Sequence, residues 1–122
     1  MIFKPTSGIS TVWAYRQMAA GAPGSYLPAT QAEERVANWI EGMGPVEALL
    51  FNNMEGPAFT KYIALPVLLE RLREEFGLAP RMSGSGSACF AFLPDGAPVA
   101  AITERIRGLW GPEVFVVETR LA

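Results

Sequence analysis

The pentapeptide "SGSGS" alternates three serines (Ser83, Ser85 and Ser87) with two glycines (Gly84 and Gly86). Glycine takes positive φ angles at no steric cost, which lets neighbouring backbone N–H groups point into one concavity. Such a nest of N–H groups favours an anion, usually a phosphate or a carboxylate. The serines add small hydrogen-bonding groups without crowding a ligand. The pattern therefore indicates either an anion-binding loop or a flexible hairpin turn, and it does not decide between them.

Two well-known phosphate-binding motifs do not fit these glycines. No Lys-Ser or Lys-Thr pair follows them, as a P-loop requires. The apolar run from Ala88 to Leu93 comes next and predicts a strand. The G-x-G of a dinucleotide fingerprint leads instead into a helix. A nucleotide site of either kind is thus not expected at this segment.

The composition excludes several other classes of function. The 122 residues fit one domain, expected to span 1–122, and half of them are hydrophobic. A net charge of −2, with scattered Lys and Arg, gives no long-range attraction to nucleic acid or to a membrane surface. The absence of histidine excludes His-based triads and His-ligated metals, and no metal site is expected.

Cys89 is the single cysteine, so no disulfide can form within the chain. Its apolar neighbours predict a buried, inert thiol. Cysteine usage of this kind is typical of a reducing compartment, and we expect a cytoplasmic protein. No apolar run is long enough to cross a bilayer.

The hydrophobic pattern predicts an α+β domain of two layers, in which helices dominate and about four short strands are antiparallel. Helices are expected over about 11–20, 30–41, 45–54, 64–76 and 98–109, with strands near 1–5, 88–93 and 113–121. Ser10 or Thr11 is a candidate N-cap of the first helix, and Thr30 of the second. The pair Gly56–Pro57 is expected to break the third helix.

Apolar spacing also predicts which faces are buried. Val36, Trp39 and Ile40 follow helical spacing and are expected to face the core. The same holds for the stripe from Leu65 to Phe76 on the fourth helix, and for the inward positions of the fifth helix, which are Val99, Ile102, Ile106 and Leu109. The three tryptophans, Trp13, Trp39 and Trp110, are interpreted as core residues.

Three stretches together resemble motifs of the GHMP kinase superfamily. "RMSGSGSACFAF" resembles its third motif, and "KPTSGISTVWAY" is similar to a P-x-x-x-[IV]-S-T-x-x-x-[YF] segment. "LFNNMEGPAFTKYIAL" is similar to an N-D-L-E region, with Asn53 in place of the usual Asp. The most similar branch phosphorylates the 2-hydroxyl of 4-diphosphocytidyl-2-C-methyl-D-erythritol in non-mevalonate isoprenoid (terpenoid) biosynthesis.

The resemblance implies the C-terminal domain of such a kinase, folded as a ferredoxin-like α/β plait with additional helices. The N-terminal domain of these kinases carries the ATP-binding loop and the catalytic residues, and no such loop occurs here. We therefore expect that domain to be missing from the chain, and no catalytic residue to lie within it. ATP and Mg²⁺ belong to the intact enzyme, and the chain alone is expected to be inactive.

The resemblance also assigns roles to individual residues. The loop of Ser83, Gly84, Ser85, Gly86 and Ser87 would line the floor of the cleft between the two domains. Thr11 would lie on the substrate side of that cleft, with a helix N-cap as its alternative role. Tyr15 would stack near the cytosine, with an ordinary core aromatic as its alternative. Asn52 and Glu55 are expected to fix loop geometry rather than to touch substrate.

Two other functions stay open at this point. The chain could be the corresponding half of another GHMP-family kinase with a different alcohol acceptor. It could also be a stand-alone, non-catalytic binding module of the same fold. In that case an exposed interdomain face would bind a partner or drive self-association.

Overall fold

The computed structural model describes residues 1–121 of the chain. In chain order the elements are β1 (Ile2–Lys4), α1 (Thr11–Ala20), α2 (Ala29–Ile40), the 3-10 helix η1 (Val46–Leu49), α3 (Glu55–Lys61), α4 (Ala64–Phe76), β2 (Arg81–Met82), β3 (Cys89–Phe90), α5 (Val99–Trp110) and β4 (Phe115–Val117). None of the helices within residues 1–121 has the length and apolar character that a membrane crossing requires.

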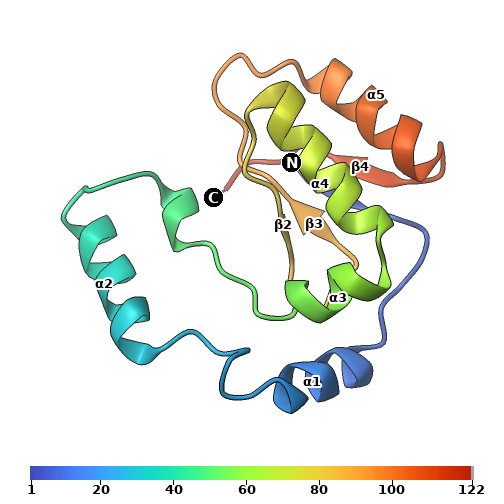
Figure 1. Ribbon diagram of the computed structural model, residues 1–122. Helices are drawn as coiled ribbons and strands as arrows, with labels where there is room; N and C mark the ends of the chain where they lie inside the picture. The colour runs from blue at the N-terminus through green and yellow to red at the C-terminus, as the bar shows by residue number, and fades with distance from the viewer. Residues whose placement is uncertain (122) are drawn as a thin grey trace.

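The four strands form one antiparallel sheet in the order β2-β3-β1-β4 (Figure 1). With α4 between β1 and β2 and α5 between β3 and β4, the chain runs β-α-β-β-α-β, which is the ferredoxin-like plait. Helices α1, α2, η1 and α3 are additions between β1 and α4. The predicted α+β plait with additional helices is confirmed, although each strand is only two or three residues long.

The core lies between one face of this sheet and the helix pair α4–α5. Phe3 pairs with Cys89, and Cys89 pairs with Met82, so the three side chains form one row across the sheet. All three are buried, and so are Leu68, Leu69 and Leu72 of α4 and Ile102 and Ile106 of α5. The predicted inward stripes of these two helices are confirmed except at Leu109, which is 42% exposed.

Helix α4 begins and ends where its sequence predicts. Pro66 lies in the first turn, where its missing N–H costs no hydrogen bond. Gly77 adopts a left-handed φ of 66° and donates its N–H to the carbonyl of Arg73 at 2.9 Å, which ends the helix. Because α4 ends at Phe76, the chain can turn there and enter β2 at Arg81, just before the glycine–serine loop.

The expected helix over 45–54 is wrong. Only Val46–Leu49 is helical there, as one 3-10 turn, and the chain is then non-helical up to Met54. Gly56 and Pro57 do not break a helix but lie in the first turn of α3, where proline is tolerated. Residues 50–54 are not helical, and within this segment the Asn52 side chain bonds to β2 and to the loop that follows it.

Helix α2 does not bury its apolar stripe, contrary to the sequence interpretation. Val36, Trp39 and Ile40 are 48%, 46% and 72% exposed, and the helix has no buried residue. Pro28 rather than Thr30 is the N-cap, and no side chain caps it. In Figure 1 α2 stands apart from the sheet and from α4 and α5. Periodicity identified the helix and its apolar face but not the element that would cover it.

Candidate functional site

The glycine–serine segment is the connection of the β2–β3 hairpin. Ser83 donates its N–H to Ala88 at 2.8 Å, and Gly86 donates to the carbonyl of Ser83 at 3.0 Å. Both glycines have positive φ, 53° at Gly84 and 79° at Gly86, and the Gly86–Ser87 peptide bond is cis. The hairpin interpretation therefore describes the local structure correctly.

This hairpin nevertheless leaves backbone donors unused. Within residues 1–121, the N–H groups of Gly84, Ser85 and Ser87 donate to no protein acceptor. Gly84 is exposed and Ser85 is half-buried, so the two residues with unused N–H groups both reach the surface. An anion accepts hydrogen bonds from such amides without adding its own donor. The hairpin and the anion-binding loop are thus compatible descriptions of one segment.

Gly86 is held in close contact with its surroundings. A Cβ atom added there would lie 2.6 Å from Sδ of Met82 and 2.9 Å from Cδ1 of Ile9. Real Cβ atoms do not approach other heavy atoms so closely, and the positive φ adds strain for any side chain. Gly84 has no atom within 4 Å of the same position, so it is required only for its φ.

Thr11 lies beside the loop. Its Oγ1 is 3.1 Å from Oγ of Ser85, and either hydroxyl can be the donor. Ser10, not Thr11, is the N-cap of α1, because its Oγ accepts the N–H of Trp13 at 3.3 Å. The N-cap role for Thr11 is therefore wrong, and its hydroxyl is available to Ser85 and to a ligand.

Tyr15 lies one helical turn after Thr11 and is 54% exposed. The alternative that it is a core aromatic is thus wrong, and its ring can accept a stacking partner. Trp13 points elsewhere, because it packs edge-on against Tyr62 with ring centroids 5.8 Å apart. The Nζ atom of Lys61 lies 4.4 Å from the centre of the Trp13 ring, a cation–π contact that fixes this side of α1 against α3.

Ser87 differs from the other two loop serines because its side chain already has a protein partner. The residue is 2% exposed, and its hydroxyl donates to the carbonyl of Ser7. This bond ties the end of the hairpin to the segment between β1 and α1. Only Ser83 and Ser85 have hydroxyls at the surface of the loop.

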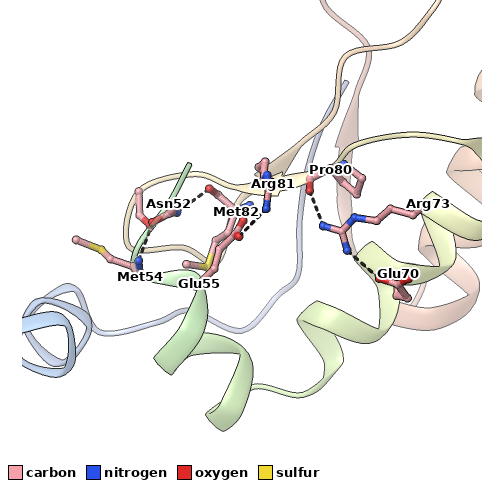
Figure 2. A network of polar contacts seen from close by, with 9 residues as sticks. Asn52, Met54, Glu55, Glu70, Arg73, Pro80, Arg81 and Met82 are labelled. Atoms are coloured by element: carbon pink, nitrogen blue, oxygen red, sulfur yellow. Dashed lines mark hydrogen bonds and ion pairs between the residues drawn. The ribbon is translucent and has the colours of Figure 1, made fainter. Parts of the chain in front are cut away.

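Asn52 and Glu55 hold the first half of the hairpin, as Figure 2 shows. Nδ2 of Asn52 donates to the carbonyls of Met82 at 2.7 Å and Gly84 at 2.8 Å, while its Oδ1 accepts the N–H of Met54 at 2.9 Å. Oε1 of Glu55 accepts the N–H of Met82 at 2.8 Å. The prediction that these two residues fix loop geometry is confirmed.

A salt bridge completes this network. Nη1 of Arg81 lies 3.2 Å from Oε2 of Glu55, whose side chain is 12% exposed. A mostly buried carboxylate needs such partners, because burial without them is costly. No sequence pattern singles out Arg81 as a partner of Glu55. Ser7 and Ile9 also contact the loop, and both belong to the segment that resembles the P-x-x-x-[IV]-S-T motif.

A hollow of about 310 Å³ adjoins the loop on the side of Asn52, and Phe51, Arg81, Gly84 and Phe90 also line it. A larger hollow of about 580 Å³ lies between the turn at Asp95 and the C-terminal residues near Glu118. None of the residues predicted to bind a ligand lines that larger hollow. We therefore centre the candidate site on the hairpin.

Cys89 lies in β3, the second strand of the hairpin, and is fully buried. Burial, which is the larger cause, and the nearby Glu55 carboxylate together raise the pKa of its thiol from 9.0 to about 12. The thiol is therefore neutral at ordinary pH, and a thiolate nucleophile does not form. The prediction of an inert thiol is confirmed.

Comparison with known proteins gives consistent matches. Residues 32–111 match the family described as "GHMP kinases C terminal". A 4-diphosphocytidyl-2-C-methyl-D-erythritol kinase of Bradyrhizobium diazoefficiens is 37% identical over 73 residues, covering 59% of this chain and 23% of that protein. The kinase of the same name from Rhizobium etli is 26% identical over 122 residues, covering 98% and 38%.

A solved structure agrees with these sequence matches. The crystal structure of a 4-(cytidine 5'-diphospho)-2C-methyl-D-erythritol kinase aligns with a TM-score of 0.58 at 29% identity, over 93% of this chain and 40% of that one. This chain thus spans less than half the length of each protein that it matches.

Proposed function

Because this chain belongs to the GHMP kinase C-terminal family, we propose that it forms the substrate-side wall of an ATP-dependent small-molecule kinase. The acceptor is 4-diphosphocytidyl-2-C-methyl-D-erythritol, the substrate in the names of the matched kinases, and the family resemblance implies its 2-hydroxyl. The observation that carries the proposal is the contact between Thr11 and Ser85, which joins two separately predicted cleft segments at 3.1 Å.

The site suits a phosphorylated ligand in three ways. The unused N–H groups of Gly84 and Ser85 supply donors that need no reorganisation. Thr11 and Ser85 add hydroxyls, and Tyr15 offers an exposed ring to the cytosine one turn away along α1. In phosphoryl transfer, positioning and charge stabilisation do most of the work, and these groups do both. None of them is a general base, so the catalytic residues belong to the rest of the kinase.

The partner in this proposal is the N-terminal kinase domain, which also holds ATP and Mg²⁺. Within residues 1–121 no group of three His, Cys, Asp or Glu side chains gathers that could bind a metal ion. The matched kinases extend well beyond the region that this chain covers. The exposed stripe of Val36, Trp39 and Ile40 is an apolar surface that such a domain would bury. We place the assembled enzyme in the cytoplasm.

A chimera tests this function. The chain replaces the corresponding 38% of the Rhizobium etli kinase, and ADP formation is measured with ATP, Mg²⁺ and a panel of alcohol acceptors. We expect turnover with 4-diphosphocytidyl-2-C-methyl-D-erythritol in the chimera and none with the chain alone. Turnover by the chain alone contradicts the half-enzyme proposal. Preference of the chimera for another acceptor assigns the chain to a different GHMP kinase.

The stand-alone binding module is the second candidate, and the exposed face of α2 is the observation that favours it. In that case the chain alone binds a partner or a second copy through Trp39 and Ile40. Sedimentation of the purified chain separates the two functions. A stable dimer that Ile40→Lys dissociates would favour the module, whereas a monomer favours the kinase half.

A further inference from the structure

Strand β2 lies at the edge of the sheet, so one side of its backbone has no neighbouring strand. Ser83 donates its N–H toward β3. Because backbone groups alternate along a strand, both the N–H and the C=O of Met82 face the open side. The unpaired N–H and C=O groups of such an edge cost free energy of folding where they are buried. Where they are exposed, they can pair with a strand of another chain.

Three side chains cover this open edge in place of a strand, and Figure 2 shows them in sequence along β2. Arg73 donates through Nη2 to the carbonyl of Pro80 at 3.2 Å, Glu55 accepts the N–H of Met82, and Asn52 donates to the carbonyls of Met82 and Gly84. Pro80 has no N–H, so it leaves no donor at this edge. The backbone edge is thus satisfied from Pro80 to the glycine–serine loop.

The last of these bonds fixes the orientation of a loop donor. The peptide group between Gly84 and Ser85 is planar and trans, so its C=O and N–H point in opposite directions. Asn52 holds the Gly84 carbonyl on its own side at 2.8 Å. The Ser85 N–H therefore points to the other side of the loop, away from Asn52. Rotation of this peptide would require the loss of that hydrogen bond.

We propose that Asn52 is a positioning residue, which sets the direction of the Ser85 N–H and thereby the affinity of the loop for phosphate. Glu55 supports it, because its bond to the Met82 N–H holds the neighbouring stretch of β2. The link to phosphate rests on the proposed function. The orientation of the peptide does not, because it follows from the hydrogen bonds alone.

Position 52 needs a side-chain donor, because the amide of Asn52 donates both to the Met82 carbonyl of β2 and to the Gly84 carbonyl of the loop. Aspartate has the same shape and retains an oxygen for the Met54 N–H, but it has no hydrogen to donate. Its second carboxylate oxygen would face two carbonyl oxygens. Asn52→Asp is thus a variant of equal size that removes the hold on the loop, and it also adds one negative charge. Asn52→Ala removes the same two bonds without adding a charge.

Arg73→Met provides the matched control. It removes the cover of the Pro80 carbonyl, at the far end of the same edge, while the bonds of Asn52 to the loop remain. Both variants uncover backbone carbonyls of the β2 edge. An effect on the loop that appears in Asn52→Asp and not in Arg73→Met therefore cannot come from a general weakening of β2.

The test uses two-dimensional ¹⁵N–¹H NMR of the 122-residue chain, titrated with inorganic pyrophosphate. We expect Asn52→Asp to shift the Ser85 amide resonance and to weaken pyrophosphate binding at least tenfold. In Arg73→Met the affinity should stay within twofold of the parent chain. Asn52→Ala is titrated beside Asn52→Asp, and a comparable loss of affinity in this uncharged variant shows that the loss does not come from the added carboxylate.

The outcomes separate the two proposals. An unchanged Ser85 resonance in Asn52→Asp overturns the positioning role, whatever the chain binds. A parent chain that binds no pyrophosphate contradicts the anion site of the proposed function, while the Ser85 amide still reports on Asn52. Equal losses of affinity in Asn52→Asp and Arg73→Met also overturn the positioning role.

Discussion

The hydroxyl of Thr11 lies 3.1 Å from that of Ser85, although 74 positions separate the two residues in the chain. This contact joins the first turn of α1 to the β2–β3 hairpin. It leaves the backbone donors of Gly84 and Ser85 unused. The two segments therefore form one surface, on which hydroxyls and N–H groups lie together and Tyr15 is exposed nearby.

Replacement of Thr11 by valine should weaken substrate binding more than it weakens the fold. The lost hydrogen bond is exposed, so the free energy of unfolding should fall by no more than about 1 kcal/mol. In the chimeric kinase we expect KM for the cytidine-containing substrate to rise several-fold. Thr11→Ser retains the hydroxyl and should restore KM. Equal KM values for Thr11→Val and the parent chimera would contradict a role in binding.

The two loop glycines should differ in their tolerance of alanine. At Gly86 a Cβ would collide with Met82 and Ile9 at a positive φ, and left-handed strain plus overpacking should cost about 2–4 kcal/mol. At Gly84 only the strain applies, at about 1–2 kcal/mol. Urea denaturation of Gly86→Ala and Gly84→Ala measures both costs. A larger loss at Gly84 would show that the packing around Gly86 has been described wrongly.

Tyr15→Ala should leave the fold nearly intact, because the side chain is 54% exposed. Loss of a stacked base would cost about 1–3 kcal/mol of binding energy, and a planar Phe at position 15 should retain most of it. Competition of CDP against the substrate of the chimera measures the effect. If Tyr15→Ala and Tyr15→Phe bind CDP equally well, the ring does not stack on the cytosine.

The sequence predicted the elements that have strong local signals. Helix α4 has an uninterrupted apolar stripe and a glycine that ends it, so both its bounds were predicted correctly. A hairpin turn was one of the two interpretations that the glycines left open, and the structure has that hairpin between β2 and β3. Family resemblance then supplied the order of the plait, which these short strands could not have specified because only two or three residues of each are paired.

Long-range partners could not be predicted from local patterns. The stripe of Val36, Trp39 and Ile40 has core-like spacing, yet nothing within residues 1–121 buries it. The spacing of apolar residues along a helix shows that one face is apolar, but it does not show which surface covers that face. In the same way, the bonds from Asn52 to Met82 and Gly84 span 30 and 32 positions, and no periodicity signals them.

The stripe on α2 should contribute little to the stability of the chain. Ile40 is 72% exposed, so Ile40→Lys should change the free energy of unfolding by less than about 0.5 kcal/mol. Leu69→Ala in the core should cost about 2–5 kcal/mol and is the control. Urea denaturation compares the two. A loss at Ile40 as large as that at Leu69 would mean that α2 packs against the domain.

Cys89 should make the fold sensitive to alkaline pH. Its thiol has a pKa of about 12 in the folded chain against 9.0 for an ordinary thiol, so unfolding releases a proton between these values. The contribution of the neutral Cys89 thiol to the free energy of unfolding is fully present below pH 9. It is lost as pH rises toward 12, by up to about 1.4 kcal/mol per pH unit.

Cys89→Ala removes this titration, and comparison with the parent chain cancels the effects of the tyrosines and lysines. Over pH 9–11 the free energy of unfolding should fall more steeply in the parent chain than in Cys89→Ala. A thiol reagent at pH 8 should modify Cys89 only after denaturant is added. Parallel pH profiles, or rapid modification of the folded chain, would place the thiol in contact with solvent.

The most direct test of the central proposal is a crystal structure of the chimeric kinase with 4-diphosphocytidyl-2-C-methyl-D-erythritol. The distance to measure is that between the backbone nitrogens of Gly84 and Ser85 and the nearest oxygen atom of a ligand phosphate. The account predicts hydrogen bonds of about 2.7–3.2 Å to at least one of these nitrogens. A substrate bound in the cleft with both amides facing solvent, and no phosphate near the hairpin, would contradict it.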